Sequence, residues 1–311
     1  MTGAMREGHG REAVAAERPL LLPCSGERLL GVLHPAGGTL GVVMVVGGPQ
    51  YRAGSHRHFV RWARSLAATG CPVLRFDTRG MGDSSGTLHS FEHIGPDIEA
   101  AIDALMQAQP HVDRVVLWGL CDAASAALLY LHDRPDPRVA GLCLLNPWAR
   151  SEQTQARTQV KHYYRQRLMQ PGFWRKLLSG QVAAGAVAGL WRALRTARTA
   201  ASGSNGGPGD DNATTDYVSR MLAGWQTFGG PIWLLLSGRD YTAKEFLALA
   251  ETDPRWARAV ASPGVTRLDL KQADHTLADH PSMRAAEVGM LAWIASAVMP
   301  ERTRAVVEAS R

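Results

Sequence analysis

The sequence contains no uninterrupted apolar run of the roughly eighteen residues that a membrane-spanning helix requires. Residues 1–18 also carry charges where a secretory signal peptide would have its apolar segment. Cysteine is scarce, and its four copies form neither a CxxC pair nor a zinc-binding spacing with histidine. We therefore expect a cytoplasmic protein with no transmembrane segment, no disulfide framework and no metal site.

The positive charge is uneven along the chain. The formal net charge of +6 at pH 7 would indicate only solubility if it were spread uniformly. Residues 150–198, however, contain ten Lys or Arg against a single acidic residue, Glu152. Nucleic acid is not the expected partner, because aromatic and base-reading patterns are absent. A solvated helical face would account for the excess, and so would a site for an anionic substrate or an acidic membrane surface.

Short apolar runs alternate with amphipathic ones from residue 28 onward. The short runs predict strands over Leu29–Leu33, Leu40–Val46, Pro72–Phe76, Arg114–Trp118, Val139–Leu145, Ile232–Leu236 and Val265–Leu270. Apolar residues that recur at three and four predict helices over Phe59–Thr69, Asp97–Ala108, Asp122–His132 and Met283–Val298. This alternation indicates an α/β fold in which helices cover both faces of a mostly parallel sheet.

The strand signal disappears over residues 149–228, and a helical, Arg-rich stretch takes its place. We expect this segment to be a helical cap insertion, with the Gly/Ser/Asn/Asp-rich residues 202–212 as a flexible loop at its end. The core then comprises residues 19–148 and 229–300. Residues 1–18 are expected to form a disordered tail, and residues 301–311 a C-terminal tail.

The most specific motif is V-V-L-W-G-L-C-D-A-A, residues 115–124. An apolar strand runs into Gly119-x-Cys121-x-Ala123 and then into a helix, which is a variant of the G-x-S-x-G nucleophile elbow. The sharp turn needs small residues on both sides of the nucleophile, and Gly119 and Ala123 supply them. Because a helix N-terminus favours the thiolate, Cys121 is the candidate nucleophile; a buried packing cysteine is the alternative.

A thiolate of this kind needs a base, and the base needs an orienting carboxylate. Asp240 follows the predicted strand that ends at Leu236, and His275 lies in the loop after the last predicted strand. The order nucleophile, acid, histidine is that of the α/β-hydrolases. We therefore predict a triad of Cys121, His275 and Asp240, with Asp274 shaping the loop.

Two backbone N–H groups are expected to stabilise an oxyanion. We assign them to Gly48, in the glycine pair after a strand, and to Asp122, the residue after the nucleophile; an ordinary glycine turn is the alternative for the first. In the segment from residue 75 to 84, R-F-D-T-R-G-M-G-D-S, Asp77 and Arg79 are expected to pin loops near the site. Its glycines lack the helix that a dinucleotide fingerprint requires, so no cofactor is expected.

Several strings resemble the α/β-hydrolase family called exosortase A system-associated hydrolase 1. They are V-V-G-G-P-Q-Y-R-A-G-S-H-R (45–57), L-R-F-D-T-R-G-M-G-D-S (74–84), W-G-L-C-D-A-A-S-A (118–126), L-L-N-P-W (144–148), K-H-Y-Y (161–164) and F-W-R-K-L-L-S-G (173–180). The resemblance spans roughly residues 20–298. It implies an α/β-hydrolase fold and an accessory role in bacterial exopolysaccharide and protein-sorting loci. Cys121 in place of serine, Ala123 in place of glycine, and Val46 where histidine often precedes the glycines depart from the wider superfamily.

We expect hydrolysis of an acyl ester or thioester, or acyl transfer, by a Cys-His-Asp triad. A non-catalytic binding or assembly protein with the same fold is the alternative. In this fold an insertion after the sixth strand normally covers the site, so its side chains help to select the substrate. The expected substrate is a small-molecule or lipid-linked acyl compound, anionic if the basic cap selects it, and peripheral membrane contact is left open. The side chains expected to bind it are Lys161, Tyr163, Tyr164, Arg165 and Arg167.

Overall fold

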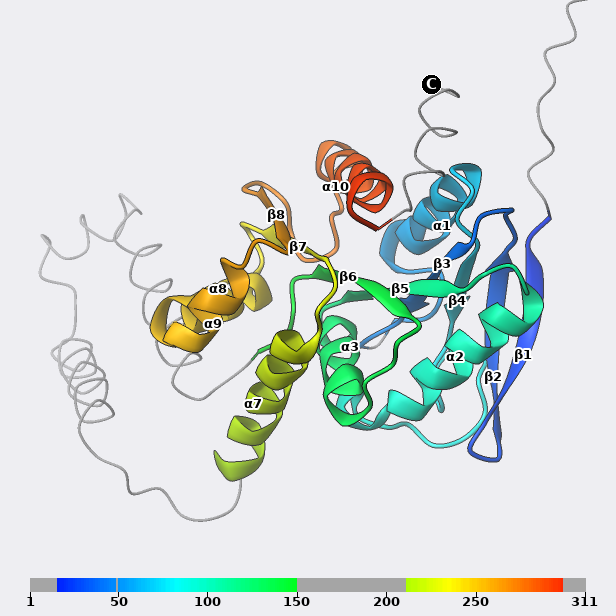
Figure 1. The fold of residues 1–311 in the computed structure, drawn as a ribbon, viewed down its shortest axis with the longest axis horizontal. Helices are drawn as coiled ribbons and strands as arrows, with labels where there is room; N and C mark the ends of the chain where they lie inside the picture. Colours follow the sequence, from blue (N-terminus) through cyan, green and yellow to red (C-terminus); the bar gives the residue numbers. More distant parts are fainter. Residues whose placement is uncertain (1–15, 49, 150–210, 299–311) are drawn as a thin grey trace, which may run out of the picture.

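The computed structural model describes residues 16–48, 50–149 and 211–298, and within them eight strands form one sheet (Figure 1). Their order across the sheet is β1-β2-β4-β3-β5-β6-β7-β8. Strand β2 runs antiparallel to both of its neighbours, and the other neighbouring pairs are parallel. The strands are β1 (Arg18–Cys24), β2 (Glu27–His34), β3 (Leu40–Val45), β4 (Val73–Phe76), β5 (Arg114–Leu120), β6 (Val139–Leu145), β7 (Ile232–Ser237) and β8 (Val265–Leu270).

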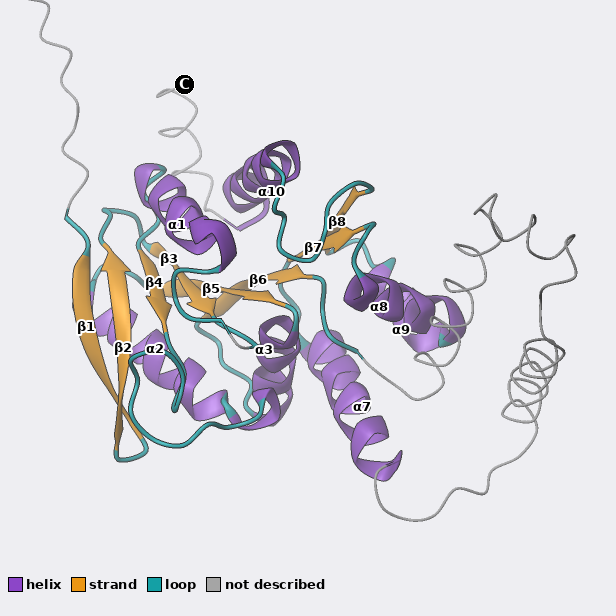
Figure 2. Cartoon of the chain, turned by 180° about the vertical axis from the view of Figure 1, so that it is seen from behind, coloured by secondary structure: helices purple, strands orange, loops and turns teal. Residues whose placement is uncertain are grey.

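Helices cover both faces of this sheet (Figure 2). Alternate side chains of a strand point to opposite faces, and the two hydrophobic clusters follow that rule: Val115 and Leu117 of β5 lie in one, Val116 and Trp118 in the other. The first cluster contains side chains of α2 (Gly95–Ala108), α3 (Asp122–Asp133), α7 (Asp211–Thr227), α8 (Tyr241–Thr252) and α9 (Pro254–Val260). The second contains those of α1 (His58–Ala68), α10 (His280–Trp293) and η3 (Ile294–Val298). Two short 3₁₀ helices, η1 (Ser55–Arg57) and η2 (Phe91–His93), are also present in the described part of the chain.

Each predicted strand and helix of the core is confirmed, but strand β1 was not predicted. In β1 only Leu22 and Cys24 are buried, because the strand forms the edge of the sheet and pairs with β2 alone. Two prolines, Pro19 and Pro23, interrupt its pattern, and proline is tolerated in sheets mainly at such edges. Helices α8 and α9 were not predicted either.

Helix α7 lies inside the stretch predicted as a cap, yet it packs against the core. Its buried face includes Met221 and Trp225, which belong to the same hydrophobic cluster as α3. The two helices approach so closely that a Cβ atom at Gly224 would lie 2.0 Å from the Leu128 carbonyl oxygen. The core therefore resumes at α7 rather than at residue 229. The rest of the predicted cap, residues 150–210, lies outside the described residues.

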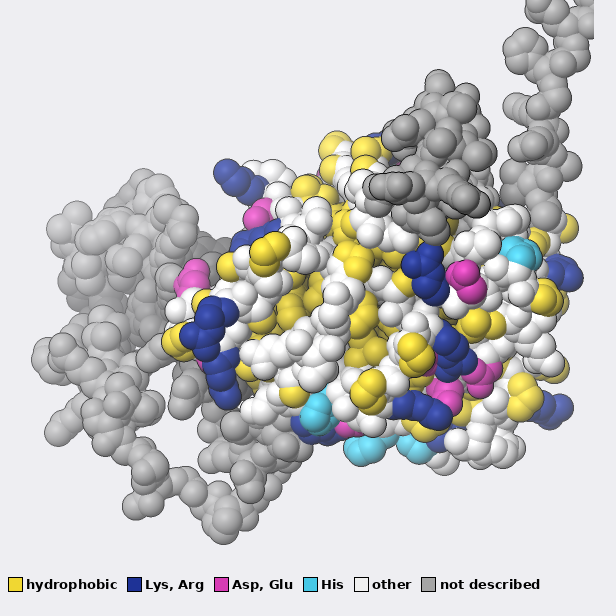
Figure 3. All heavy atoms as spheres, viewed as in Figure 1, with side chains coloured by type: hydrophobic (Ala, Val, Ile, Leu, Met, Phe, Trp, Pro, Cys, Tyr) yellow, Lys and Arg dark blue, Asp and Glu magenta, His cyan; other side chains and the backbone are white. Residues whose placement is uncertain are grey.

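Charges are dispersed on the face of the molecule seen in Figure 3, where Lys and Arg side chains stand singly or beside Asp and Glu. Arg138, for example, contacts both Asp103 and Asp136. Within the described ranges, no helix has both the length and the hydropathy needed to cross a bilayer.

Candidate active site

The predicted catalytic residues all lie at the carboxyl ends of the parallel strands, on the same side of the sheet. Cys121 directly follows β5, Asp240 lies three residues after β7, and His275 lies in the loop after β8. In an open parallel sheet, ligands bind just outside the carboxyl ends of the strands. The topology therefore places the three side chains where an α/β protein builds its site.

Cys121 sits on a strained turn between β5 and α3. Its φ and ψ are 64° and −126°, a conformation that non-glycine residues rarely adopt. The turn is so tight that a Cβ atom at position 119 would lie 2.6 Å from the carbonyl oxygen of Ala123, so only glycine fits there. The predicted strand, turn and helix are thus present, and the turn presents a partly exposed cysteine.

His275 connects Cys121 to Asp240. Its Nδ1 lies 2.8 Å from Oδ2 of Asp240, and the Cys121 side chain is close enough to the ring to influence its pKa. The hydrogen bond with Asp240, followed by that with Cys121, raises the pKa of His275 to about 10, although burial opposes the shift. At neutral pH the ring is therefore an imidazolium that donates to the carboxylate and faces the sulfur.

The carboxylate of Asp240 is held rigidly because it also begins helix α8. Its Oδ1 accepts the N–H of Thr242 at 3.0 Å and its Oδ2 that of Ala243 at 3.3 Å. The side chain is only 5% exposed, which leaves it little freedom to turn away from His275. One residue thus serves as helix N-cap and as the partner of the imidazolium.

The remaining cysteines are poor nucleophiles. Burial raises the pKa of all three thiols, that of Cys71 to about 12. Each is buried, whereas Cys121 is partly exposed. Because the thiolate is the reactive form, these surroundings disfavour reaction at Cys24, Cys71 and Cys143.

Asn146 is a positioning residue that the sequence did not reveal. It follows β6, is completely buried, and its Oδ1 accepts the N–H of Ser237 at 2.8 Å. Its Nδ2 donates to Oγ of Ser237 at 3.0 Å and to the backbone oxygen of His275 at 3.5 Å. Asn146 therefore ties the loop of the histidine to the ends of two central strands. The string L-L-N-P-W marked this position, but gave no role to the asparagine.

The glycine pair after β3 does approach the elbow, but its N–H is already engaged. The N–H of Gly48 donates to Oδ2 of Asp122 at 2.9 Å. The prediction that Gly48 offers this group to an oxyanion thus differs from the structure, in which a carboxylate of the chain accepts it. Burial raises the pKa of Asp122, although the N–H groups of Gly48, Ala123 and Asp122 itself favour its charged form.

Asp77 and Arg79 pin loops beside the site, as predicted. Oδ1 of Asp77 accepts the N–H of Arg52 at 2.6 Å, which fastens the loop after β3. Arg79 forms an ion pair with the fully buried Asp97, with 2.7 Å between Nη2 and Oδ2, and fastens the loop after β4 to helix α2. Asp77 and Asp97 thus each hold a loop in place through contacts within the protein.

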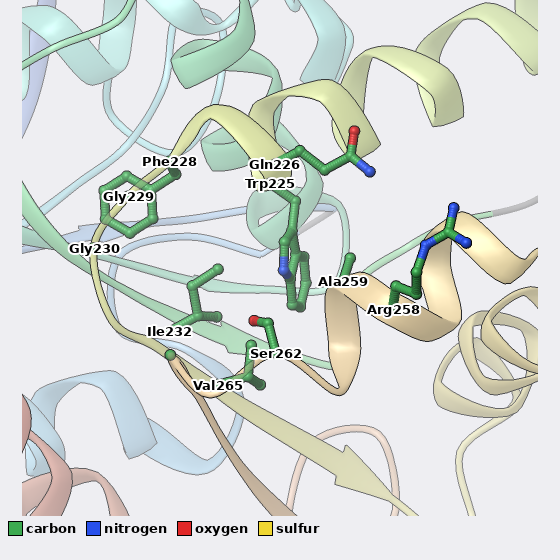
Figure 4. A pocket seen from close by; sticks show the side chains of 11 residues that line it. Trp225, Gln226, Phe228, Gly229, Gly230, Ile232, Arg258, Ala259, Ser262 and Val265 are labelled. Atoms are coloured by element: carbon green, nitrogen blue, oxygen red, sulfur yellow. The ribbon is translucent and has the colours of Figure 1, made fainter.

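The predicted substrate-binding side chains lie outside the described residues; they are Lys161, Tyr163, Tyr164, Arg165 and Arg167. A pocket of about 380 Å³ does exist among the described residues, but at the amino ends of β7 and β8 (Figure 4). Its lining includes Trp225, Phe228 and Arg258. Because the triad lies at the opposite, carboxyl ends of the strands, this pocket is not part of the candidate active site.

A family profile described as "Serine aminopeptidase, S33" matches residues 39–188. The matched region contains the elbow but neither Asp240 nor His275. Its description names a serine enzyme, whereas this chain carries Cys121 at the elbow. No curated protein matches the sequence.

The chain is similar in structure to an esterase from Pyrococcus furiosus, with a TM-score of 0.60 and 15% identity over 91% of this chain and 92% of the esterase. It is also similar to Est1E from Butyrivibrio proteoclasticus with ferulic acid bound (TM-score 0.57, 15% identity, 89% and 100% covered). A third similar structure is the haloalkane dehalogenase DatA from Agrobacterium tumefaciens (TM-score 0.51, 17% identity, 90% and 97% covered). The predicted α/β-hydrolase fold is therefore confirmed. Because esterases and a dehalogenase share it, the fold does not specify the reaction.

Proposed function

We propose that this α/β-hydrolase-fold protein is a hydrolase that cleaves acyl esters or thioesters through Cys121, His275 and Asp240. The observation that supports this proposal most directly is the hydrogen bond between His275 and Asp240, with the Cys121 side chain at a strained nucleophile elbow close enough to raise the pKa of His275. Cys121 lies beside His275 at a helix N-terminus, which is the arrangement of a cysteine nucleophile with an adjacent base. No cofactor takes part in the proposed reaction.

In the first half-reaction the sulfur of Cys121 attacks the carbonyl carbon and forms a C–S bond, while the carbonyl electrons move to the oxygen. The tetrahedral intermediate then collapses, the bond to the leaving alcohol or thiol breaks, and His275 gives its proton to the leaving group. Asp240 keeps the imidazole oriented and stabilises its charged form. The product is a thioester between the acyl group and Cys121.

In the second half-reaction the neutral His275 removes a proton from water, and the oxygen attacks the thioester carbonyl. Collapse of this second intermediate expels the Cys121 thiolate, releases the carboxylic acid and leaves the imidazolium that started the cycle. An acceptor hydroxyl in place of water would give acyl transfer by the same steps. The N–H of Asp122, and that of Gly48 once freed, are the proposed donors to the oxyanion.

The substrate class follows from the sequence of the predicted cap. Its basic side chains favour an anionic acyl compound, such as a lipid-linked or phosphorylated carrier, or contact with an acidic membrane surface. The resemblance described above implies an accessory role in a bacterial exosortase and exopolysaccharide system, which we include in the proposal. Both assignments belong to the proposal.

The competing function is a binding or assembly protein that retains the elbow without turnover. The engaged N–H of Gly48 favours this alternative, because a carboxylate of the chain accepts this proposed oxyanion donor in the resting structure. The contact of His275 with both Cys121 and Asp240 favours the enzyme.

A panel of acyl substrates distinguishes the two functions. Wild-type protein and the Cys121→Ala variant are tested in parallel against neutral and anionic 4-nitrophenyl esters and acyl thioesters. The proposal expects hydrolysis of at least one substrate class by the wild type and only background hydrolysis by the variant. Equal rates above background would remove Cys121 as the nucleophile, and hydrolysis by neither protein would support the binding protein.

A further inference from the structure

The carboxyl group of Asp122 accepts a hydrogen bond from the Gly48 N–H, which the proposed mechanism assigns to the oxyanion. Its Oδ2 accepts the N–H of Gly48, from the turn after β3, at 2.9 Å. The N–H groups of Asp122 itself and of Ala123, from the first turn of α3, also act on this carboxylate. Donors from two separate elements thus converge on one negatively charged oxygen-bearing group beside Cys121. Such converging backbone N–H groups form an anion-binding site.

The glycine turn is fitted to the elbow by packing as well as by this hydrogen bond. A Cβ atom at Gly47 would lie 2.0 Å from Oδ1 of Asp122, 2.7 Å from the backbone nitrogen of Ala123 and 2.9 Å from its Cβ atom, so the turn lies directly against both this carboxyl group and α3. Two of these three atoms belong to Ala123, so the turn also packs against α3 apart from the carboxyl group of Asp122. We therefore expect the contact with Ala123 to keep the turn against α3 if the carboxyl group leaves Gly48.

The carboxyl group itself is imperfectly satisfied in this position. Its Oδ1 is buried and has no hydrogen-bond partner among the described residues. A buried acceptor without a partner is destabilising, because it has lost its bonds to water without replacement. The contact between Asp122 and Gly48 is consequently one that a better-placed acceptor can displace.

We propose that Asp122 is a gate on the oxyanion site: its carboxyl group holds the Gly48 N–H at rest, and the acyl oxygen of a bound substrate must displace it. The gate rests on the proposed function, since it presumes that Cys121 attacks a carbonyl. It makes the donors available only when a substrate oxygen competes for them. The carboxyl group of Asp122 acts here by withholding the Gly48 N–H, and this carboxyl group forms no bond to the substrate.

The test uses [1-¹³C]hexanal, a small aldehyde that a thiol adds to reversibly. The sulfur bonds the carbonyl carbon, the thiol proton ends on the oxygen, and that oxygen takes the place of the oxyanion. The dissociation constant of the adduct is measured by ¹³C NMR for wild type, Asp122→Ala, Asp122→Asn and the control Asp113→Ala, which removes an exposed charge from the loop before β5. Cys121→Ala shows which signal belongs to Cys121.

The gate predicts that Asp122→Ala binds hexanal about three- to tenfold more tightly than wild type, the worth of one displaced hydrogen bond. Asp122→Asn should fall between the two, because a neutral amide oxygen is a weaker acceptor than a carboxylate. Asp113→Ala should match wild type. The rate of iodoacetamide alkylation, which needs no oxyanion donor, is measured on the same proteins and should rise less than the affinity does.

Three results would overturn the gate. Weaker or unchanged hexanal binding in both Asp122 variants would show that the carboxyl group only supports the turn, with the proposed function intact. If hexanal affinity and the rate of iodoacetamide alkylation rise by the same factor in the Asp122 variants, the substitution acts on the reactivity of the Cys121 thiol and not on the oxyanion donors. No adduct in any protein would overturn the proposed function and the gate together. If Asp122→Ala does not fold, the isosteric Asp122→Asn decides.

Discussion

The substitution Asp240→Asn removes the negative charge of the hydrogen-bond partner that most strongly raises the pKa of His275, while retaining the shape of the side chain. The rise from 6.5 to about 10 corresponds to about 5 kcal/mol in favour of the imidazolium, shared between Asp240 and Cys121 and opposed by burial. Alanine would be a poor choice, because Asp240 also caps α8 through Thr242 and Ala243, and losing a cap costs about 1 kcal/mol. Asparagine is an equally good cap.

The amide has only one acceptor atom, whereas both oxygens of the carboxylate accept hydrogen bonds. If the amide oxygen takes the place of Oδ1 and accepts the N–H of Thr242, its NH₂ group faces Nδ1 of His275, where a donor is already present. The imidazolium then loses its acceptor, and the neutral ring is held in the wrong tautomer. We expect kcat/KM at neutral pH to fall about 100-fold, equivalent to about 2.7 kcal/mol.

The pH dependence of activity shows in which direction Asp240→Asn changes the pKa of His275. Since the pKa of His275 is raised, the ring keeps its proton up to about pH 10, and activity should fall only above that value. Removing the charge of Asp240 lowers this pKa, so the alkaline limb should move toward neutrality by at least about one pH unit. Initial rates of ester hydrolysis between about pH 5 and 11 measure this shift of the alkaline limb.

The control is Asp253→Asn, which changes the equivalent N-cap of α9, where Oδ1 accepts the N–H of Arg255 at 2.8 Å. That variant should retain the wild-type profile. The reasoning is refuted if Asp240→Asn has the rate and the alkaline limb of wild type, because the carboxylate would then not set the protonation of His275.

Three further outcomes are expected. Iodoacetamide at neutral pH should label Cys121 first by peptide mapping, because burial raises the pKa of the other thiols; earlier labelling elsewhere would remove it as nucleophile. Cys121→Ser should unfold at the same temperature as wild type yet lose about 100-fold in kcat, since an alcohol is far less readily ionised; full activity would show that the thiol is not required. Changing Lys161, Arg165 and Arg167 together to Gln should raise KM for an anionic ester and spare a neutral one; equal effects on both would exclude a charge-selecting cap.

Most of the sheet was predictable because its central strands are buried on both faces. The strand β6, for example, has only Ala140 partly exposed, so it reads as a continuous apolar run. The edge strand β1 has no such run. Helix α7 gave no sign of its place in the core, because its fit depends on Gly224 meeting the carbonyl of Leu128, a contact between distant parts of the chain.

The candidate triad was predictable for a different reason: each member follows a strand, and the elbow has a local motif. The supporting contacts were not, because they join residues far apart in sequence and depend on where side chains point. Asn146 reaches Ser237 across 91 positions, and Gly48 reaches Asp122 across 74. No local pattern records which of the oxygens near the elbow will accept an N–H.

The central claim is that Cys121 forms the covalent intermediate, and mass spectrometry of the acylated protein tests it most directly. The protein is mixed with an activated acyl ester that the substrate panel has identified, quenched in acid within the first turnover, and digested for peptide mapping. The account predicts one added acyl group, located on Cys121, with none in the Cys121→Ala variant. An acyl group on another residue, or turnover by the wild type that never acylates Cys121, would contradict it.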